Sequence, residues 1–264
     1  MWLRVTSELD MHLTAASPML LLLRPRSDAH QWVAADRYRV TPDIDVAEYT
    51  DRHGNLCQRL MAPAGPFSIH VSADVRIRPE PVHVTDALFV PVEQLPDDVL
   101  VYLLPSRFCE ADRLGRKAWE IVGGCRPGHE QVTAISRWIH SHIEYRTETD
   151  PTPISASEVL ARGSGVCRDL AHLGMALCRS LSIPARITAG YVHDLEPMDL
   201  HAWFEAWVGG RWHTFDPTQA RPGNRRVRLA YGRDAADVPL YHLFGPPAIP
   251  TRMEVSVETL TPAG

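Results

Sequence analysis

The chain of 264 residues has very little lysine, because Lys117 is the only lysine among its 27 basic residues. Acidic residues number 32, so the formal charge is −5. The chain therefore has no overall basic field, which argues against nucleic acid or an anionic membrane as a partner. Hydrophobic residues make up 45% and charged residues 22% of the chain, a composition typical of a globular protein and not of a disordered one.

Cysteine is also scarce, and long apolar runs are missing. Five cysteines are too few, and odd in number, for a disulfide framework in a chain of this length. None has C-x-x-C spacing, and the 13 histidines never form H-E-x-x-H, so we expect no metal and no cofactor. The apolar run at 19–23 is about a quarter of a membrane span, and Glu8 and Asp10 precede it, unlike a signal peptide. We expect a cytoplasmic protein with reduced thiols.

Residues 1–105 are predicted to form an N-terminal β-rich domain. Short segments at 2–5, 31–33, 37–40 and 68–71 alternate apolar and polar residues, and turn residues at 51–55 and 64–66 separate them. Strands at this spacing are typical of an antiparallel β-sandwich. No catalytic constellation lies in this part of the chain.

Residues 106–264 are predicted to form a second domain of helices packed on an antiparallel sheet, which makes the fold class α+β. The expected helices cover 111–122 and 127–145, and a third begins near Gly165 and ends near Pro184. Strands are expected at 185–192, 201–208 and 211–215, and the proline- and arginine-rich segment 217–245 is expected to be largely irregular. Alternation returns at 253–260, which predicts a last strand, and the N-terminal sheet is the candidate partner of this strand. Three arginines of the irregular segment are interpreted as solvated surface: Arg225, Arg226 and Arg228.

Cys167 is the cysteine whose surroundings suit a nucleophile. It follows the small residues 163–166 and stands at the start of the third predicted helix. At a helix N-terminus, the unpaired N–H groups and the positive end of the dipole favour a thiolate over a thiol, and glycines let a substrate backbone approach closely. Cys57, Cys109 and Cys178 are expected to pack in the core.

A thiolate nucleophile needs an imidazole, and the imidazole needs a group that orients it. If Gly209 and Gly210 form the two-residue turn of a hairpin, His201 lies opposite Thr218. His201 and Asp216 are then diagonal neighbours on one face of the hairpin, about 7 to 8 Å apart in the backbone. A turn shifted by one residue would place them on opposite faces.

These motifs resemble the transglutaminase-like superfamily, which has a papain-type fold. The resemblance covers about residues 130–220, and the first hundred residues together with 103–109 resemble the β-rich region that precedes this domain in many bacterial members. It implies that Cys167 is the nucleophile, His201 the general base and acid, and Asp216 the group that orients the imidazole. The order Cys, His, Asp matches the family, and the motifs that carry the resemblance are Gly163-Ser164-Gly165-Val166-Cys167-Arg168-Asp169, Ile183-Pro184-Ala185-Arg186 with Gly190-Tyr191, His201-Ala202-Trp203-Phe204-Glu205, and Trp212-His213-Thr214-Phe215-Asp216-Pro217-Thr218.

The neighbours of these three residues have open assignments. Trp203 and Glu205 share the face of His201, where Trp203 either walls the imidazole or packs in the core, and Glu205 either forms a buried pair or packs. Asp169 and Arg168 lie in the first turn of the third helix, where a carboxylate also suits a simple cap. Tyr145 is a candidate for a second oxyanion donor beside the Cys167 N–H. Three further histidines are assigned to structure or solvent: His172, His193 and His213.

The resemblance implies acyl transfer through a thioester on a protein or peptide substrate. If water resolves the thioester, the protein is a cysteine peptidase or amidase, which the resemblance favours. If an amine resolves it, the protein is a transglutaminase, and the triad does not distinguish the two. No acidic cluster suggests the calcium sites of animal transglutaminases. A catalytically silent binding scaffold is the alternative from another class. The sequence does not determine the oligomeric state.

Overall fold

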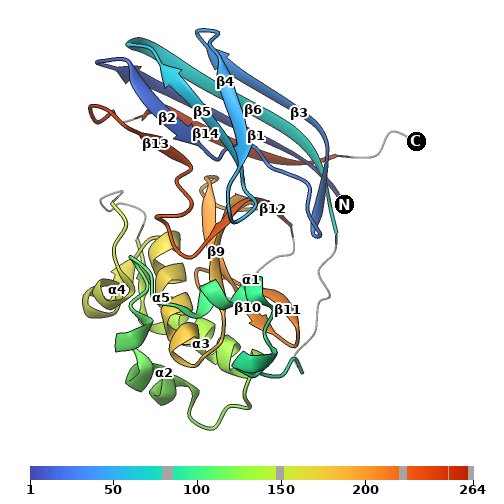
Figure 1. The fold of residues 1–264 in the computed structure, drawn as a ribbon, viewed down its shortest axis with the longest axis vertical. Helices are drawn as coiled ribbons and strands as arrows, with labels where there is room; N and C mark the ends of the chain where they lie inside the picture. Colours follow the sequence, from blue (N-terminus) through green and yellow to red (C-terminus); the bar gives the residue numbers. More distant parts are fainter. Residues whose placement is uncertain (79–85, 147–151, 220–224, 249, 261–264) are drawn as a thin grey trace.

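A computed structural model describes residues 1–78, 86–146, 152–219, 225–248 and 250–260. The chain combines antiparallel sheets with a set of helices, which confirms the predicted α+β class. A β-sandwich lies at one end of the molecule, and a third four-stranded sheet with the helices lies at the other (Figure 1).

The sandwich consists of two four-stranded antiparallel sheets, with the strand orders β14-β1-β6-β3 and β13-β2-β5-β4. Along β1 and β6 every second side chain is buried, because one face of each strand packs against the facing sheet. This confirms the predicted antiparallel sandwich. The strands from the N-terminal part of the chain are β1 (Trp2–Leu13), β2 (Ser17–Leu21), β3 (Gln31–Thr41), β4 (Val46–Thr50), β5 (Leu56–Ala62) and β6 (Gly65–Ile77).

Two strands of the sandwich come from the C-terminal end of the chain. β14 (Pro250–Leu260) contains the strand expected at 253–260, and it pairs with β1 along its length. β13 (Tyr241–Leu243) pairs with β2 at an edge of the other sheet. In Figure 1 these red strands lie among the blue strands of the N-terminal part.

Segment 217–245 was expected to be largely irregular, and most of its described residues are, but the prediction missed two strands. Residues 220–224 of this segment lie outside the described residues. The segment contains β13 and also β12 (Arg226–Gly232), a strand in which every residue is buried. β12 is the edge strand of the sheet β11-β10-β9-β12, and the burial of every residue shows that both of its faces are covered. Its first residues do alternate, but its two arginines are buried against carboxylates that lie far away in the chain, and local sequence does not reveal such partners.

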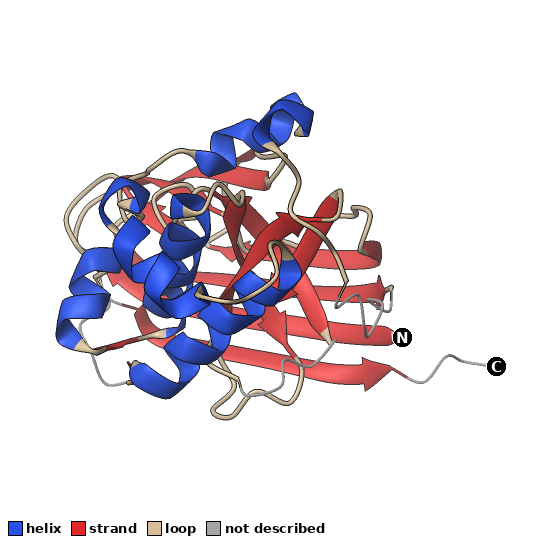
Figure 2. Cartoon of the chain, turned by 90° about the horizontal axis from the view of Figure 1, so that it is seen from below, coloured by secondary structure: helices blue, strands red, loops and turns tan. Residues whose placement is uncertain are grey.

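The second half of the molecule is built on a sheet with the order β11-β10-β9-β12. The helices gather in front of the strands when the molecule is seen from this end (Figure 2). The central helix, α5, packs directly on β10 and β9. Its Gly174 allows this approach, because a Cβ there would clash with the ring of Phe204. The elements are α5 (Cys167–Ser180), β9 (Ala185–Val192), β10 (His201–Val208) and β11 (Arg211–Phe215).

The remaining helices partly match the predicted ones. The predicted helix at 127–145 is shorter, because the chain after it becomes extended and Glu144–Tyr145 pairs with Ser164–Gly165. None of the helices in the described ranges is long and apolar enough to cross a membrane. These other elements are η1 (Val92–Gln94), α1 (Asp97–Leu100), η2 (Val101–Leu103), η3 (Ala111–Arg113), α2 (Gly115–Val122), α3 (His129–His142), β7 (Glu144–Tyr145), α4 (Ala156–Arg162) and β8 (Ser164–Gly165).

Candidate active site

Cys167 is the first residue of α5 and lines a cavity. Asp169 closes the turn beneath it: one carboxylate oxygen accepts from the Val166 N–H at 3.2 Å, and the other accepts from the Ile154 N–H at 3.4 Å. Asp169 therefore acts as a helix cap. Cys167 thus stands at the N-terminal end of α5, where the helix dipole is positive.

The hairpin of β10 and β11 has the predicted register. Val208 pairs with Arg211, and Gly209 and Gly210 form the turn with positive φ angles of 59° and 79°. The same register brings His201 and Asp216 together on one face. Nε2 of His201 lies 2.9 Å from Oδ2 of Asp216, and both side chains are almost fully buried. The predicted proximity of these two residues is confirmed.

Asp216 receives hydrogen bonds from four donors. Its Oδ2 accepts from His201 at 2.9 Å and from Nη1 of Arg226 at 3.0 Å. Its Oδ1 accepts from the N–H of Thr218 at 3.1 Å and from the Thr218 hydroxyl at 2.7 Å. Burial would raise the pKa of Asp216, but these donors and the charges of His201 and Arg226 hold that pKa well below its usual range. Asp216 is therefore an ionised and fully bonded carboxylate.

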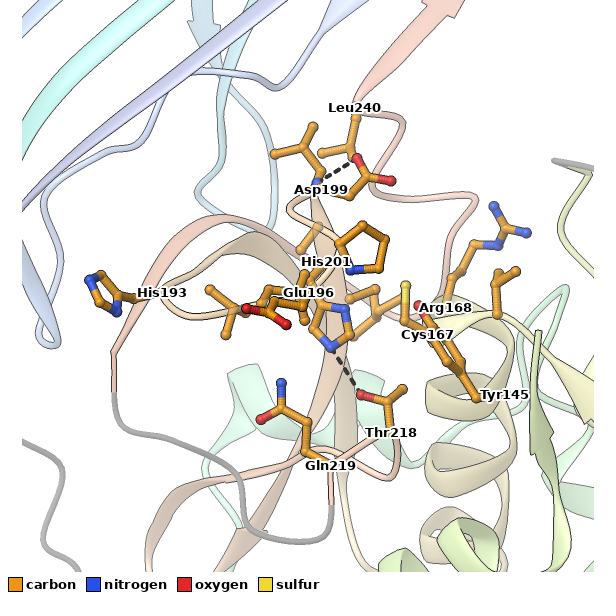
Figure 3. A pocket seen from close by; sticks show the side chains of 18 of the residues that line it. Tyr145, Cys167, Arg168, His193, Glu196, Asp199, His201, Thr218, Gln219 and Leu240 are labelled. Carbon is orange, nitrogen blue, oxygen red and sulfur yellow. Dashed lines mark hydrogen bonds between the residues drawn. The ribbon is translucent and has the colours of Figure 1, made fainter. Parts of the chain in front are cut away.

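His201 lies between Asp216 and Cys167. Burial lowers the pKa of His201, but the hydrogen bonds to Asp216 and to Cys167 outweigh it and raise this pKa to about 9. Because Nε2 faces Asp216, Nδ1 is the ring nitrogen left for Cys167, whose sulfur lies on the other side of the imidazole from Thr218 (Figure 3). The ring of Trp203 stacks against the imidazole, with centroids 6.4 Å apart and planes 24° apart. Trp203 thus walls the imidazole, one of the two roles that the sequence left open.

The cavity has a volume of about 920 Å³, and Cys167 and His201 both line it. Tyr145 lines it on the Cys167 side (Figure 3). Burial and the negative charges nearby, including those of Cys167 and Asp216, raise the pKa of Tyr145 to about 12. Its hydroxyl therefore stays protonated and can donate a hydrogen bond into the cavity. Asp194 and Glu196 also line the cavity and are exposed to solvent.

Glu205 is the centre of a second group of buried ion pairs, beside the group that surrounds Asp216. The two oxygens of Glu205 accept from Arg186 at 2.7 Å and from Arg228 at 2.9 Å, so Glu205 forms a buried pair. Burial raises the pKa of Glu205, but these two guanidinium groups lower it to about 2. The guanidinium of Arg186 also lies over the rings of Trp212 and Tyr231, 4.2 and 3.9 Å from their centroids. Such stacking stabilises a desolvated cation.

The prediction that three arginines lie on the solvated surface was wrong for two of them. Arg226 and Arg228 are 3% and 4% exposed, whereas the side chain of Arg225 is 47% exposed. A buried arginine is not distinguished from a surface one by local sequence, since its partners are distant in the chain. Thr218 is a further residue of the site that sequence reasoning misses, although the hairpin register places it opposite His201.

The other candidate residues have structural places. His172 is fully buried: its Nδ1 bonds the Ile154 carbonyl at 3.0 Å, and its Nε2 accepts from the Ala235 N–H at 3.2 Å. Burial lowers its pKa to about 4, so it is neutral. Cys109 and Cys178 are fully buried, and burial raises the pKa of both thiols, that of Cys109 to about 12. Within the described ranges no group of three or more His, Cys, Asp or Glu residues could hold a metal ion.

Comparison with known families finds two matches along the chain. Residues 116–217 match the model described as "Transglutaminase-like superfamily". Residues 13–78 match the model described as "Bacterial transglutaminase-like N-terminal region". The first match contains Cys167, His201 and Asp216, and the second lies within the β-sandwich.

Two similar proteins extend over most of the chain. "Uncharacterized protein ML0607" from Mycobacterium leprae (strain TN) is 26% identical over 229 residues, which are 82% of each chain. A crystal structure named "Putative Cysteine Protease from Cytophaga hutchinsonii" is 34% identical, with a TM-score of 0.94 over 100% of this chain and 92% of that chain. The sandwich and the helical half thus occur together in the same arrangement in that protein.

Proposed function

Since the chain belongs to the transglutaminase-like superfamily, we propose that it is a thiol-dependent enzyme that hydrolyses amide bonds of peptides or proteins. In this proposal Cys167 is the nucleophile, His201 the general base and acid, and Asp216 the group that orients His201. The observation that carries it is the buried hydrogen bond of 2.9 Å between His201 and Asp216, beside Cys167 at a helix N-terminus. The solved relative carries the name "Putative Cysteine Protease", which agrees with this reaction class.

The first half of the proposed reaction forms a thioester. The Cys167 thiolate attacks the amide carbonyl carbon, a C–S bond forms, and the carbonyl oxygen becomes an oxyanion. Nδ1 of the His201 imidazolium then donates its proton to the amide nitrogen. The C–N bond breaks, the amine leaves, and the acyl group remains on Cys167. Asp216 holds the ring through Nε2, so the proton at Nδ1 faces the substrate side.

The second half returns the enzyme to its starting state. Neutral His201 takes a proton from water at Nδ1, and the resulting hydroxide attacks the thioester carbonyl. The C–S bond breaks, and the products are a carboxylic acid and the Cys167 thiolate beside imidazolium. The N–H of Cys167 and the hydroxyl of Tyr145 are the proposed donors to the oxyanion in both halves.

Water is the proposed acceptor because the cavity is accessible to solvent. Asp194 and Glu196 on its wall are exposed, and the side chain of Arg225, which also lines it, is 47% exposed. A site that favours an amine over water has to exclude water from the thioester. Charged and solvated side chains at the cavity favour hydrolysis instead.

The test is a peptide library incubated with the protein, with and without a primary amine, and analysed by mass spectrometry. We expect cleavage in both conditions, and we expect Cys167→Ser to abolish it. Cys125→Ser is the matched control, because Cys125 is the other cysteine that is only partly buried. Its variant should cleave like the unaltered protein.

Three results would contradict the proposal. Cysteine-dependent incorporation of the amine in place of cleavage would make the protein a transglutaminase. Cleavage that persists in Cys167→Ser would exclude Cys167 as the nucleophile. If iodoacetamide at pH 6 labels Cys167 no faster than a free thiol and no peptide is turned over, the protein is a binding scaffold.

A further inference from the structure

β12 is an edge strand of the sheet β11-β10-β9-β12, and two side chains from the sandwich occupy its free edge. The carboxamide of Gln31 accepts from the Arg228 N–H at 2.7 Å and donates to the Arg228 carbonyl at 2.8 Å. The carboxamide of Asn55 accepts from the Tyr231 N–H at 2.8 Å and donates to the Tyr231 carbonyl at 2.7 Å. Each amide therefore bonds both backbone groups of one residue, as the next strand of a sheet would.

A β-bulge in β12 makes this double attachment possible. In a regular strand, residues three apart turn their backbone groups to opposite edges. The register of β12 against β9 shifts between Arg228 and Ala230, which inserts Leu229 as an extra residue. With the inserted residue, Arg228 and Tyr231 turn their backbone groups to the same edge. That edge faces the sandwich, as Figure 1 shows for β12.

The two amides are themselves held rigidly. Gln31 and Asn55 are 1% and 0% exposed. Gln31 also donates to the Arg26 carbonyl at 2.8 Å, and Asn55 donates to Asp51 at 2.9 Å. On the opposite edge β12 lies close to β9. The approach at Gly190 is so close that a Cβ there would clash with the Val227 carbonyl. β12 is thus fixed from both edges, and a shift of β12 would leave buried amides without partners.

β12 in turn carries Arg226 to Asp216. Nη1 of Arg226 bonds Oδ2 of Asp216, the same oxygen that accepts from His201. The guanidinium also lies over Trp203, 5.0 Å from the ring centroid, and Trp203 stacks on His201. Arg226 therefore contacts both groups that border the imidazole. A change in the position of β12 moves the charge that faces the Asp216 carboxylate.

We propose that Arg226 is a positioning residue for Asp216, and that Gln31 and Asn55 of the sandwich hold its strand in place. The sandwich thereby completes the active site, although Gln31 and Asn55 line no part of the cavity. This inference rests on the proposed function, in which Asp216 orients His201. It assigns Gln31 and Asn55 a role in the reaction rate.

The test uses Gln31→Ala and Asn55→Ala in the full chain, with Gln58→Ala as the matched control. Gln58 is also a fully buried amide of the sandwich, but it bonds Leu56 of its own strand. We expect kcat to fall at least about tenfold for Gln31→Ala and Asn55→Ala, with KM within about twofold. The alkaline limb of the pH profile moves to lower pH, because a displaced Asp216 no longer raises the pKa of His201. Gln58→Ala lowers the melting temperature without changing the limb.

The role of Arg226 is tested with one variant that removes its positive charge and one that keeps it. Arg226→Gln lowers kcat and moves the acid limb to higher pH, because the pKa of a carboxyl group rises when a facing cation is removed. Arg226→Lys keeps the charge and recovers part of kcat. Equal losses in Lys and Gln, with unchanged pH limbs, overturn the positioning role. So does a loss of kcat in Gln31→Ala that Gln58→Ala matches.

A readout without turnover separates this inference from the proposed function. The rate of Cys167 alkylation by iodoacetamide at pH 6 depends on the imidazolium beside it, and it needs no substrate. We expect alkylation to slow about tenfold in Gln31→Ala and to stay unchanged in Gln58→Ala. If the unaltered protein turns over no peptide but this difference is found, the proposed function fails and the positioning inference stands. If peptide is cleaved but alkylation is equal in both variants, the inference fails alone.

Discussion

Asp216 shows how one buried residue can be fixed in orientation by its donors. Four hydrogen bonds occupy its two oxygens, and both cationic partners share Oδ2. The carboxylate cannot rotate without breaking bonds that water cannot replace in a buried site. The imidazole of His201 is consequently held with Nδ1 toward the sulfur of Cys167. Preorganisation of this kind lowers the reorganisation needed during proton transfer.

The pH dependence expected of the proposed reaction follows from His201. Imidazolium is populated below its pKa of about 9 and is lost above it, so the rate should decline as the pH rises through about 9. Asp216→Asn removes the bonding that raises this pKa, while burial still lowers it. We expect kcat to fall by roughly two to four powers of ten and the alkaline limb to move to lower pH. Rate profiles from pH 5 to 10 measure both effects.

The control for this variant is Asp74→Asn. Asp74 pairs with Arg4 at the surface of the sandwich, 2.7 Å away, and it should leave the pH profile unchanged. An alkaline limb that stays at about pH 9 in Asp216→Asn would show that Asp216 does not govern the protonation of His201.

Among the elements, β10 and β12 are connected across β9 by buried charges. Glu205 of β10 bonds Arg228 of β12, and Asp216, just after β11, bonds Arg226 of β12. A buried ion pair adds little to stability compared with apolar packing, but loss of one partner is costly. These pairs therefore select one alignment of the strands and one position for the residues of the active site.

The Glu205 pair makes stability depend on acid. The pKa of Glu205 is lowered from 4.5 to about 2 in the folded chain, so its contribution is present above pH 4.5 and is lost as the pH falls toward 2. The shift corresponds to about 3 kcal/mol in the free energy of unfolding. We expect Glu205→Gln to unfold more easily at pH 7 and to show a smaller further loss at pH 3. Urea unfolding at the two pH values measures this.

Glu254→Gln is the surface control, because Glu254 pairs with Arg252 at 2.6 Å in a solvated site. Its unfolding midpoints should follow those of the unaltered chain. A Glu205→Gln variant with the same acid dependence as the unaltered chain would contradict the assignment to Glu205.

At the scale of the whole molecule, the two ends of the chain meet in the sandwich. β14 from the C-terminal end pairs with β1, and β13 pairs with β2, so both sheets of the sandwich need strands from both ends. The hydroxyl of Tyr191 in β9 donates a hydrogen bond to the Ser7 hydroxyl in β1 at 3.1 Å. Gln31 and Asn55 attach β12 to the sandwich. Neither half retains all its buried contacts when the other unfolds.

We therefore expect a single cooperative unfolding transition for the full chain. Calorimetric and van't Hoff enthalpies should agree, and near-ultraviolet and far-ultraviolet circular dichroism should change together. The buried contacts between sandwich and helical half are the physical reason. Two separated transitions would show that the sandwich and the helical half are independent units.

The parts of the site that could be predicted from sequence are those governed by local rules. The helix beginning at Cys167 follows from its apolar spacing, and the pairing of His201 with Asp216 follows from the two glycines of one turn. The parts that could not be predicted depend on distant residues. Arg226 looked like a surface arginine because its partner Asp216 and its ring neighbour Trp203 lie in other strands.

The sequence by itself determined the helix that begins at Cys167, the hairpin that carries His201 and the register of that hairpin, because each depends on residues within about twenty positions of one another. Only the tertiary structure decided what lies behind them. It brought Gln31 to Arg228 across 197 positions and Asn55 to Tyr231 across 176. These contacts form only when strands from both ends of the chain complete the sandwich and the sandwich packs against β12. No turn rule or periodicity specifies them, because such rules describe residues that are close in the sequence.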